Sequence, residues 1–184
     1  AAVDAAVAAV RSALPPVIGL ANVAGVSSPI DFLDVTTAEW DRVFAVNMRG
    51  AFLVTRLVVP TMIAARAGRI VSISSVSAQR GGGTYSKVPY SASKAAIIGF
   101  TRALAREMGP HGITVNCVAP GPVDTDIMGG TLTDERKAAM SADIPLGRVG
   151  TVDDVAALVT FLMSEDAGYI TAATYDINGG LQIS

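Results

Sequence analysis

A tyrosine and a lysine four residues apart, Tyr90 and Lys94, are the side chains of this sequence whose types and spacing best suggest catalysis. They fall at the start of a segment with helical periodicity, so both project from one face of the expected helix. A phenol ordinarily holds its proton until about pH 10. A nearby ammonium and the positive N-terminal end of a helix both favour the phenolate. Such a phenol can give a proton to a carbonyl oxygen or take one from an alcohol.

Polar residues elsewhere in the sequence could serve the same chemistry. Ser74 and Ser75 end an apolar run, where a hydroxyl could hydrogen-bond the same reacting oxygen. Asn47 stands in the middle of a helical pattern, which is unfavourable unless its amide has a task. Pro120 and Gly121 follow another apolar run, and we expect their backbone to be open to a flat ligand.

The elements that position these residues alternate regularly along the chain. Short apolar runs at 16–21, 69–75, 113–118 and 174–177 are typical of strands buried on both faces. Between them, helical patterns cover 2–13, 36–65, 89–109, 133–142 and 152–163. This alternation predicts an α/β fold with a doubly wound parallel sheet. Ligands then bind beyond the carboxyl ends of the strands, just after Ala21, Ser74 and Val118.

Composition narrows the class of protein. The 184 residues include 14 Lys and Arg against 16 Asp and Glu, a net charge of −2. One domain over residues 1–184 is expected, and without an excess of basic residues we expect no nucleic-acid partner. The single cysteine, Cys117, excludes an internal disulfide. We find no apolar run of about 18 residues and no leader segment, so we expect no membrane contact and a cytoplasmic location.

Five motifs stand in an order and spacing that resemble the classical short-chain dehydrogenases/reductases. They are Asn22-Val23-Ala24-Gly25, Val46-Asn47-Met48-Arg49-Gly50, Ile73-Ser74-Ser75, Tyr90-x-x-x-Lys94 and Pro120-Gly121. The closing segment Asp176-Ile177-Asn178-Gly179-Gly180 fits the same pattern. Within the family, the sequence is most similar to the 3-oxoacyl-(acyl carrier protein) reductases and to bacterial alcohol and polyol dehydrogenases. The resemblance implies a Rossmann-type fold.

The resemblance also implies an activity and a role for each catalytic residue. The reaction would interconvert a secondary alcohol and a ketone with NAD or NADP. Tyr90 would exchange the proton, Ser75 would hydrogen-bond the substrate oxygen, Lys94 would lower the pKa of Tyr90 and hold the nicotinamide ribose, and Asn47 would anchor a water that links Lys94 to solvent. The separation of Ser75 and Tyr90 is longer than the family's usual spacing, so Ser74 and Ser77 remain alternatives.

Cofactor contacts carry over from the same motifs. They are Asn22, Ala24, Gly25, Tyr90, Lys94, Pro120, Gly121, the backbone of Val123, and Thr125. Val23 stands where the family has a second asparagine. The family's glycine-rich phosphate loop does not occur in this sequence, nor does the residue that chooses between NAD and NADP. We therefore expect a catalytic domain that lacks the first two strand–helix units. The triple glycine 81–83 is expected to be a lid or substrate loop, and no metal site is expected.

The sequence also leads to expectations about the substrate, the assembly of subunits and an alternative function. The substrate would be a small alcohol or ketone, or a group bound to an acyl carrier, and the sequence does not choose among them. The resemblance implies a homodimer or homotetramer formed through the helices 36–65 and 89–109. The alternative is an inactive fragment or non-catalytic scaffold of the same fold. It would self-associate through the exposed strand at 17–21, because an unpaired strand edge favours pairing with another chain.

Overall fold

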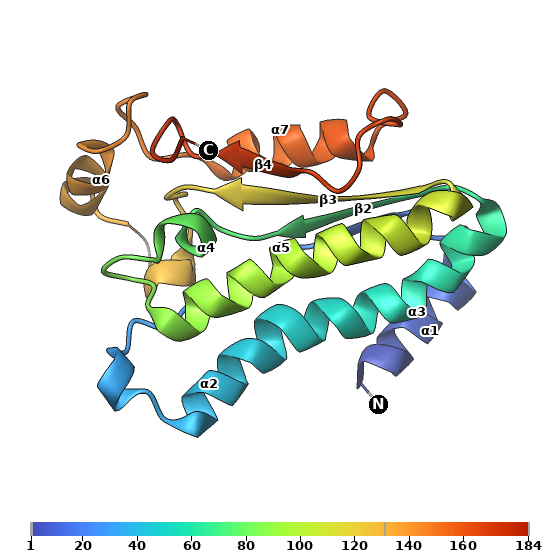
Figure 1. The fold of residues 1–184 in the computed structure, drawn as a ribbon, viewed down its shortest axis with the longest axis horizontal. Coiled ribbons are helices and arrows are strands. Elements are labelled where there is room, and N and C mark those ends of the chain that lie inside the picture. Colours follow the sequence, from blue (N-terminus) through green and yellow to red (C-terminus); the bar gives the residue numbers. More distant parts are fainter. Residues whose placement is uncertain (1, 131, 184) are drawn as a thin grey trace.

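A parallel sheet forms the centre of the computed structural model, which describes residues 2–130 and 132–183. Within these ranges it has four strands in the order β1 (Gly19–Asn22), β2 (Gly68–Ile73), β3 (Ile113–Pro120) and β4 (Thr174–Ile177). Each strand runs parallel to its neighbour (Figure 1). The predicted parallel α/β architecture is confirmed. The first strand begins three residues later than predicted, beyond the two prolines 15 and 16, which have no N–H for a ladder.

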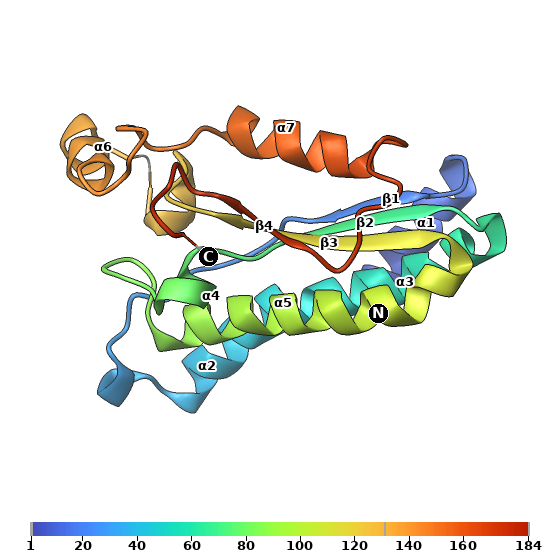
Figure 2. The same cartoon turned by 45° about the horizontal axis from the view of Figure 1, so that its top comes forward.

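Helices cover both faces of this sheet. They are α1 (Ala2–Ala13), α2 (Thr37–Phe44), α3 (Gly50–Ala65), α4 (Ser77–Arg80), α5 (Val88–Met108), α6 (Asp134–Ser141) and α7 (Val152–Met163). A π-helical turn, Ala45–Arg49, joins α2 to α3. Helices α1, α3 and α5 lie on one face and α7 on the other (Figure 2). The sequence predicted all of these except the short α4, which ends at Gly81 in the left-handed conformation (φ 90°).

Local signals explain where several helices begin. The Thr36 hydroxyl accepts a hydrogen bond from the Glu39 N–H at 3.1 Å, which caps α2. Thr151 and Asp154 form a reciprocal capping box at α7. Pro89 occupies the first turn of α5, where its missing N–H costs nothing. The start of α5 therefore fixes the position of Tyr90.

Successive strand residues point to opposite faces, which divides the core in two. Ile70 packs with Met62 of α3 and with Val115 in one buried cluster. Its neighbour Val71 packs with Leu162 of α7 in another. The sheet is thus packed between two helical layers.

The continuous helix 37–65 is long and apolar enough to span a membrane by length and composition alone, which corrects the expectation that no segment is. Its buried side chains include Val43, Val58 and Met62. Met62 and Val58 pack against the sheet in the core. This face of the helix is therefore a structural layer of the domain.

Candidate active site

A cavity of about 580 Å³ opens at the carboxyl ends of the strands, as parallel α/β sheets predict. Ser75, Tyr90 and Lys94 line it together. The segments around it are those after β1, β2 and β3, the start of α5, parts of α6 and α7, and Leu181. Residues far apart in sequence therefore meet at one site.

Tyr90 and Lys94 are buried beside one another, one turn apart on α5. Their exposed fractions are 8% and 3%. The Lys94 Nζ lies 5.7 Å from the centroid of the Tyr90 ring and donates a hydrogen bond to the Ile73 carbonyl at 2.8 Å. This bond ties the ammonium to the end of β2, next to the serines.

Burial sets the protonation of both groups. It raises the pKa of the Tyr90 phenol, and a hydrogen bond with Ser75 opposes this only in part. Burial lowers the pKa of Lys94 from 10.5 to about 8. The expected lowering of the Tyr90 pKa by Lys94 is therefore not what this structure shows, because loss of solvent outweighs the favourable contacts. At pH 7 Tyr90 is a neutral phenol that still carries its proton, beside a cationic Lys94.

Each of the three candidate serines has a different environment. Ser74 Oγ donates to the Lys94 carbonyl at 2.7 Å, and Ser77 Oγ bonds Ser86 Oγ at 2.9 Å. Ser75 Oγ accepts from the Ser77 N–H at 3.1 Å, and its side chain acts on the Tyr90 phenol by opposing the rise in the Tyr90 pKa. Of the three, Ser75 is thus the serine whose side chain influences the Tyr90 phenol.

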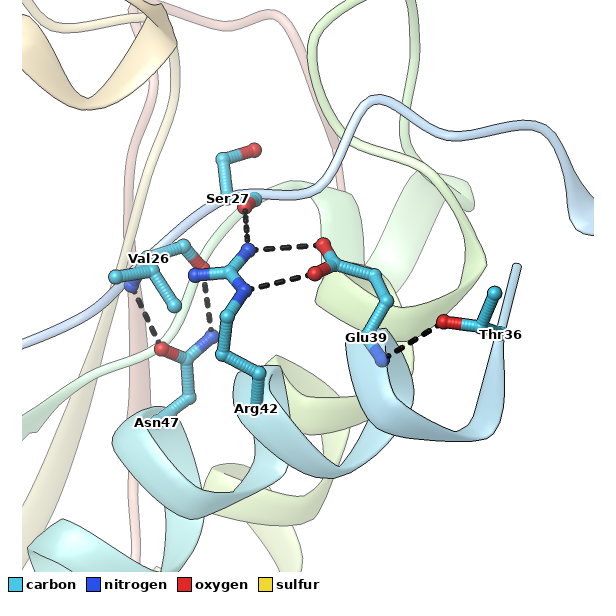
Figure 3. Close-up of polar contacts among 6 residues, drawn as sticks. All are labelled: Val26, Ser27, Thr36, Glu39, Arg42 and Asn47. Carbon is cyan, nitrogen blue, oxygen red and sulfur yellow. Dashed lines mark hydrogen bonds and ion pairs between the residues drawn. The ribbon is translucent and has the colours of Figure 1, made fainter. Parts of the chain in front are cut away.

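Asn47 lies in the π-helical turn, and its amide is bonded to Val26 in the segment after β1 (Figure 3). Its Oδ1 accepts from the Val26 N–H at 2.8 Å, and its Nδ2 donates to the Val26 carbonyl at 3.0 Å. Nδ2 also donates to Ser93 Oγ at 2.9 Å, and Ser93 in turn donates to the Tyr90 carbonyl at 2.8 Å. Both N–H groups of Asn47 are used within the protein. Any water it anchors must therefore be held through an oxygen.

An ion pair on α2 holds the same segment from the other side. Arg42 contacts both carboxylate oxygens of Glu39, at 2.7 and 2.8 Å, and lowers the pKa of Glu39 to about 2. It also donates to the Ser27 carbonyl at 3.2 Å (Figure 3). Ser27 Oγ then donates to the Tyr85 carbonyl at 2.6 Å. The glycine-rich loop 81–87 is thereby anchored at the rim of the cavity.

The predicted cofactor residues divide into two groups. Those that line the cavity are Tyr90, Lys94, Pro120, Gly121, Val123 and Thr125. Asn22, Ala24 and Gly25 do not line it, although the adjacent Val23 does. The Asn22 amide donates instead to Thr55 and Ser72, at 3.1 and 3.2 Å.

Two glycines in these motifs are required for close packing. A Cβ on Gly25 would lie 3.2 Å from Lys94 Nζ and 3.4 Å from Asn47 Oδ1. A Cβ on Gly121 would lie 2.9 Å from Asn178 Cα. Gly121 was expected to open the backbone to a ligand, but its missing side chain primarily makes room for Asn178.

The structure adds residues that the motifs did not indicate. Arg80, Tyr85 and Ile127 line the cavity, as do four residues of α7, namely Val152, Val155, Ala156 and Val159. No spacing in the sequence marks these residues. Ser93 could have been found, because it lies three residues after Tyr90 on the same helix face. No group of three or more His, Cys, Asp or Glu that could hold a metal occurs in the part of the chain described.

A parallel sheet layered between helices, with serine, tyrosine and lysine meeting beyond its strand ends, defines the Rossmann-type dehydrogenase class. The chain belongs to the short-chain dehydrogenase/reductase family. The model of a family described as enoyl-(acyl carrier protein) reductase matches residues 1–182.

Curated relatives agree with this assignment. An uncharacterized short-chain type dehydrogenase/reductase of Sinorhizobium fredii is 45% identical over 89% of this chain and 65% of its own length. Nodulation protein G of Azospirillum brasilense is 42% identical over 96% of this chain and 71% of its own. A 3-oxoacyl-(acyl-carrier-protein) reductase of Aquifex aeolicus is 44% identical over 88% and 64%. The chain thus spans about two thirds of the length of these relatives.

Proposed function

We propose that this chain carries the catalytic site of an NAD(P)-dependent oxidoreductase that interconverts a secondary alcohol and a ketone. The observation that carries the proposal is the meeting of Ser75, Tyr90 and Lys94 in one cavity. Family membership supports the same class of reaction.

The protonation states at the site suit ketone reduction near neutral pH. Tyr90 holds a proton that it can give to a carbonyl oxygen as that oxygen gains negative charge. The Ser75 hydroxyl can donate a second hydrogen bond to the same oxygen. Lys94 supplies a positive charge within the buried site, where such charges act strongly. Asn47 and Ser93 hold the first turn of α5 in place through the Tyr90 carbonyl.

A nicotinamide cofactor, when bound, supplies the hydride. The residues present fit its nicotinamide end. The backbone of Pro120–Val123 and Thr125 forms one wall of the cavity that also holds Tyr90 and Lys94, and Gly25 leaves free the space beside Lys94 Nζ that a side chain would occupy. The Asn22 amide does not fit this role, since it is bonded inside the protein.

We propose a class of substrate for this site and not a single compound. Apolar residues from three segments, Ile127, Met140 and Val155, line the cavity beside the polar centre, and an aliphatic group would fit there. An acyl-carrier-bound 3-oxoacyl group is one such substrate, and relatives of this chain carry that activity in their names. A small ketone is the other.

Tyr90→Phe tests the reaction. We expect it to lower NADH- or NADPH-dependent ketone reduction, measured at 340 nm, by about 10²–10⁴-fold while leaving the thermal unfolding midpoint nearly unchanged. Tyr169→Phe is the matched control, because Tyr169 is fully exposed, and it should retain activity. Full activity in the Tyr90 variant would overturn the proposal.

We further propose that the chain assembles as a homodimer or homotetramer through the helices 37–65 and 88–108. Trp40 and Phe44 stack with ring centroids 4.7 Å apart, and Phe52 is 42% exposed on the same helix. Phe44, Met48, Arg49 and Phe52 line a shallow hollow there. An apolar surface of this kind is typical of a contact between subunits.

A second candidate function is a non-catalytic scaffold that self-associates. The position of β1 favours it, because in the described sheet β1 pairs with β2 alone and has a free edge. Titration with NADH and NADPH separates the two. Binding of either nucleotide supports the oxidoreductase, whereas a chain that binds neither and forms open-ended assemblies supports the scaffold.

A further inference from the structure

The described charged side chains that line the cavity are all cationic. Of the described residues that line it, Arg80 and Lys94 are the ones that carry charge at neutral pH, and no Asp or Glu is among them. Lys94 is buried and bonded to the Ile73 carbonyl. Arg80 is exposed, and its guanidinium has no hydrogen bond or ion pair with any described residue. The cavity therefore contains a free cation in addition to the catalytic lysine.

Arg80 is held at a defined place relative to the reaction centre. It ends α4, and Ser75 lies five residues earlier. Both residues line the same cavity. Two contacts fix the helix. Gln79 Nε2 donates to Asp176 Oδ1 of β4 at 2.8 Å, and Ser77 Oγ bonds Ser86 Oγ at 2.9 Å. A ligand in this cavity can therefore meet the Arg80 guanidinium while Ser75 holds its carbonyl oxygen.

Resting on the proposed function, we propose that Arg80 determines specificity by selecting ketones that carry a carboxylate close to the reacting carbonyl, that is, short-chain oxo acids. A guanidinium binds a carboxylate with two parallel charge-assisted hydrogen bonds. No acidic residue among those described in the cavity wall competes for it. The apolar lining accommodates the carbon skeleton, and the serine and tyrosine hold the oxygen to be reduced.

The test compares acetoacetate with ethyl acetoacetate, which has the same oxo group but no charge. Arg80→Gln is expected to lower kcat/KM for acetoacetate by about 10- to 100-fold, the value of a charge-assisted hydrogen bond. It should change kcat/KM for the ester by less than about threefold and leave the KM for NADH or NADPH unchanged. Arg80→Lys should recover part of the loss. The control is Arg102→Gln, an exposed arginine of α5 away from the cavity, which should change nothing.

A second readout needs no cofactor. Saturation-transfer NMR should detect acetoacetate bound to the unmodified chain and lose most of that signal with Arg80→Gln. The role of Arg80 would be overturned if Arg80→Gln lowered kcat/KM equally for acetoacetate and its ethyl ester, or raised the KM for the cofactor. It would also be overturned if acetoacetyl-CoA, assayed as a third substrate, were the only one affected. If no ketone is turned over at all, the proposed reaction fails, while the NMR comparison still decides whether Arg80 binds the carboxylate.

Discussion

Asn47 pairs with the backbone of Val26 through both ends of its side-chain amide, as one strand pairs with another (Figure 3). Its remaining N–H reaches Ser93. Asn47→Ala leaves three polar groups without this partner, two on the part-buried Val26 and one on the buried Ser93, and we expect the free energy of unfolding to fall by about 2–4 kcal/mol. Urea denaturation measures this loss. Turnover per folded molecule should fall as well, because Ser93 bonds the Tyr90 carbonyl.

Asn116 offers a matched control. It is also fully buried, and its amide donates to the Ile170 carbonyl at 2.8 Å and accepts from the Ala173 N–H at 3.2 Å. Asn116→Ala should cost similar stability without a change in turnover per folded molecule. If the two variants affect turnover equally, Asn47 has only a structural role.

Lys94 makes stability depend on pH in a defined direction. Burial sets its pKa to about 8 in the folded chain, against 10.5 ordinarily, so the unfolded chain binds more protons between these values. The free energy of unfolding therefore rises as pH increases from about 8 to 10.5. In Lys94→Met this contribution disappears. At pH 7, removing the buried ammonium should raise the free energy of unfolding by on the order of 1–3 kcal/mol. Loss of the hydrogen bond to the Ile73 carbonyl should lower it by about 1 kcal/mol, so the variant should be more stable overall.

The measurement is the difference in the free energy of unfolding between the unmodified chain and Lys94→Met, followed by chemical denaturation from pH 6 to 10.5. This difference separates the effect of Lys94 from that of the other groups that titrate in this range. It should shrink as pH rises through 8. A difference that stays constant over this range would show that the Lys94 ammonium is not penalised by burial.

Local patterns were sufficient to predict most elements of the fold. The threonine caps of α2 and α7, the proline that begins α5 and the apolar runs of the strands act over a few residues, so they can be read directly from the sequence. The short α4 escaped prediction because its four residues contain no periodicity. The positions of Tyr90 and Lys94 on one helix face likewise followed from their spacing.

The predictions that were wrong concern groups whose properties depend on their surroundings in the fold. The rise in the Tyr90 pKa comes from burial by segments distant in sequence. Gly121 is required by Asn178, 57 positions along the chain. Asn22 is bonded to Thr55 and Ser72 on other elements. Packing between elements determines these features, and no local pattern contains that information.

Phe52 should control assembly. A charged side chain at a partly exposed apolar position is costly in a subunit contact but not in solvent. We expect the unmodified chain to show the mass of a dimer or tetramer in light scattering, and Phe52→Glu to shift it toward the monomer. Phe161→Glu is the control, since Phe161 is exposed to a similar degree, 45%, on α7. Unchanged mass in the Phe52 variant would place the subunit contact elsewhere.

Arg136 of α6 and Tyr85 of the loop 81–87 join the two sides of the cavity rim. The guanidinium lies 4.4 Å from the Tyr85 ring centroid, and its Nε donates to Tyr85 Oη at 3.2 Å. Arg136→Ala should speed amide hydrogen exchange in residues 81–87 and 134–141, with a loss of less than about 1 kcal/mol in global stability. Substrate KM should rise more than kcat falls, because a looser rim binds substrate less well while Tyr90 keeps its position. Tyr85→Phe removes the hydroxyl but keeps the ring, so it should give an intermediate exchange rate. Identical exchange in all three proteins would mean that this contact does not hold the rim closed.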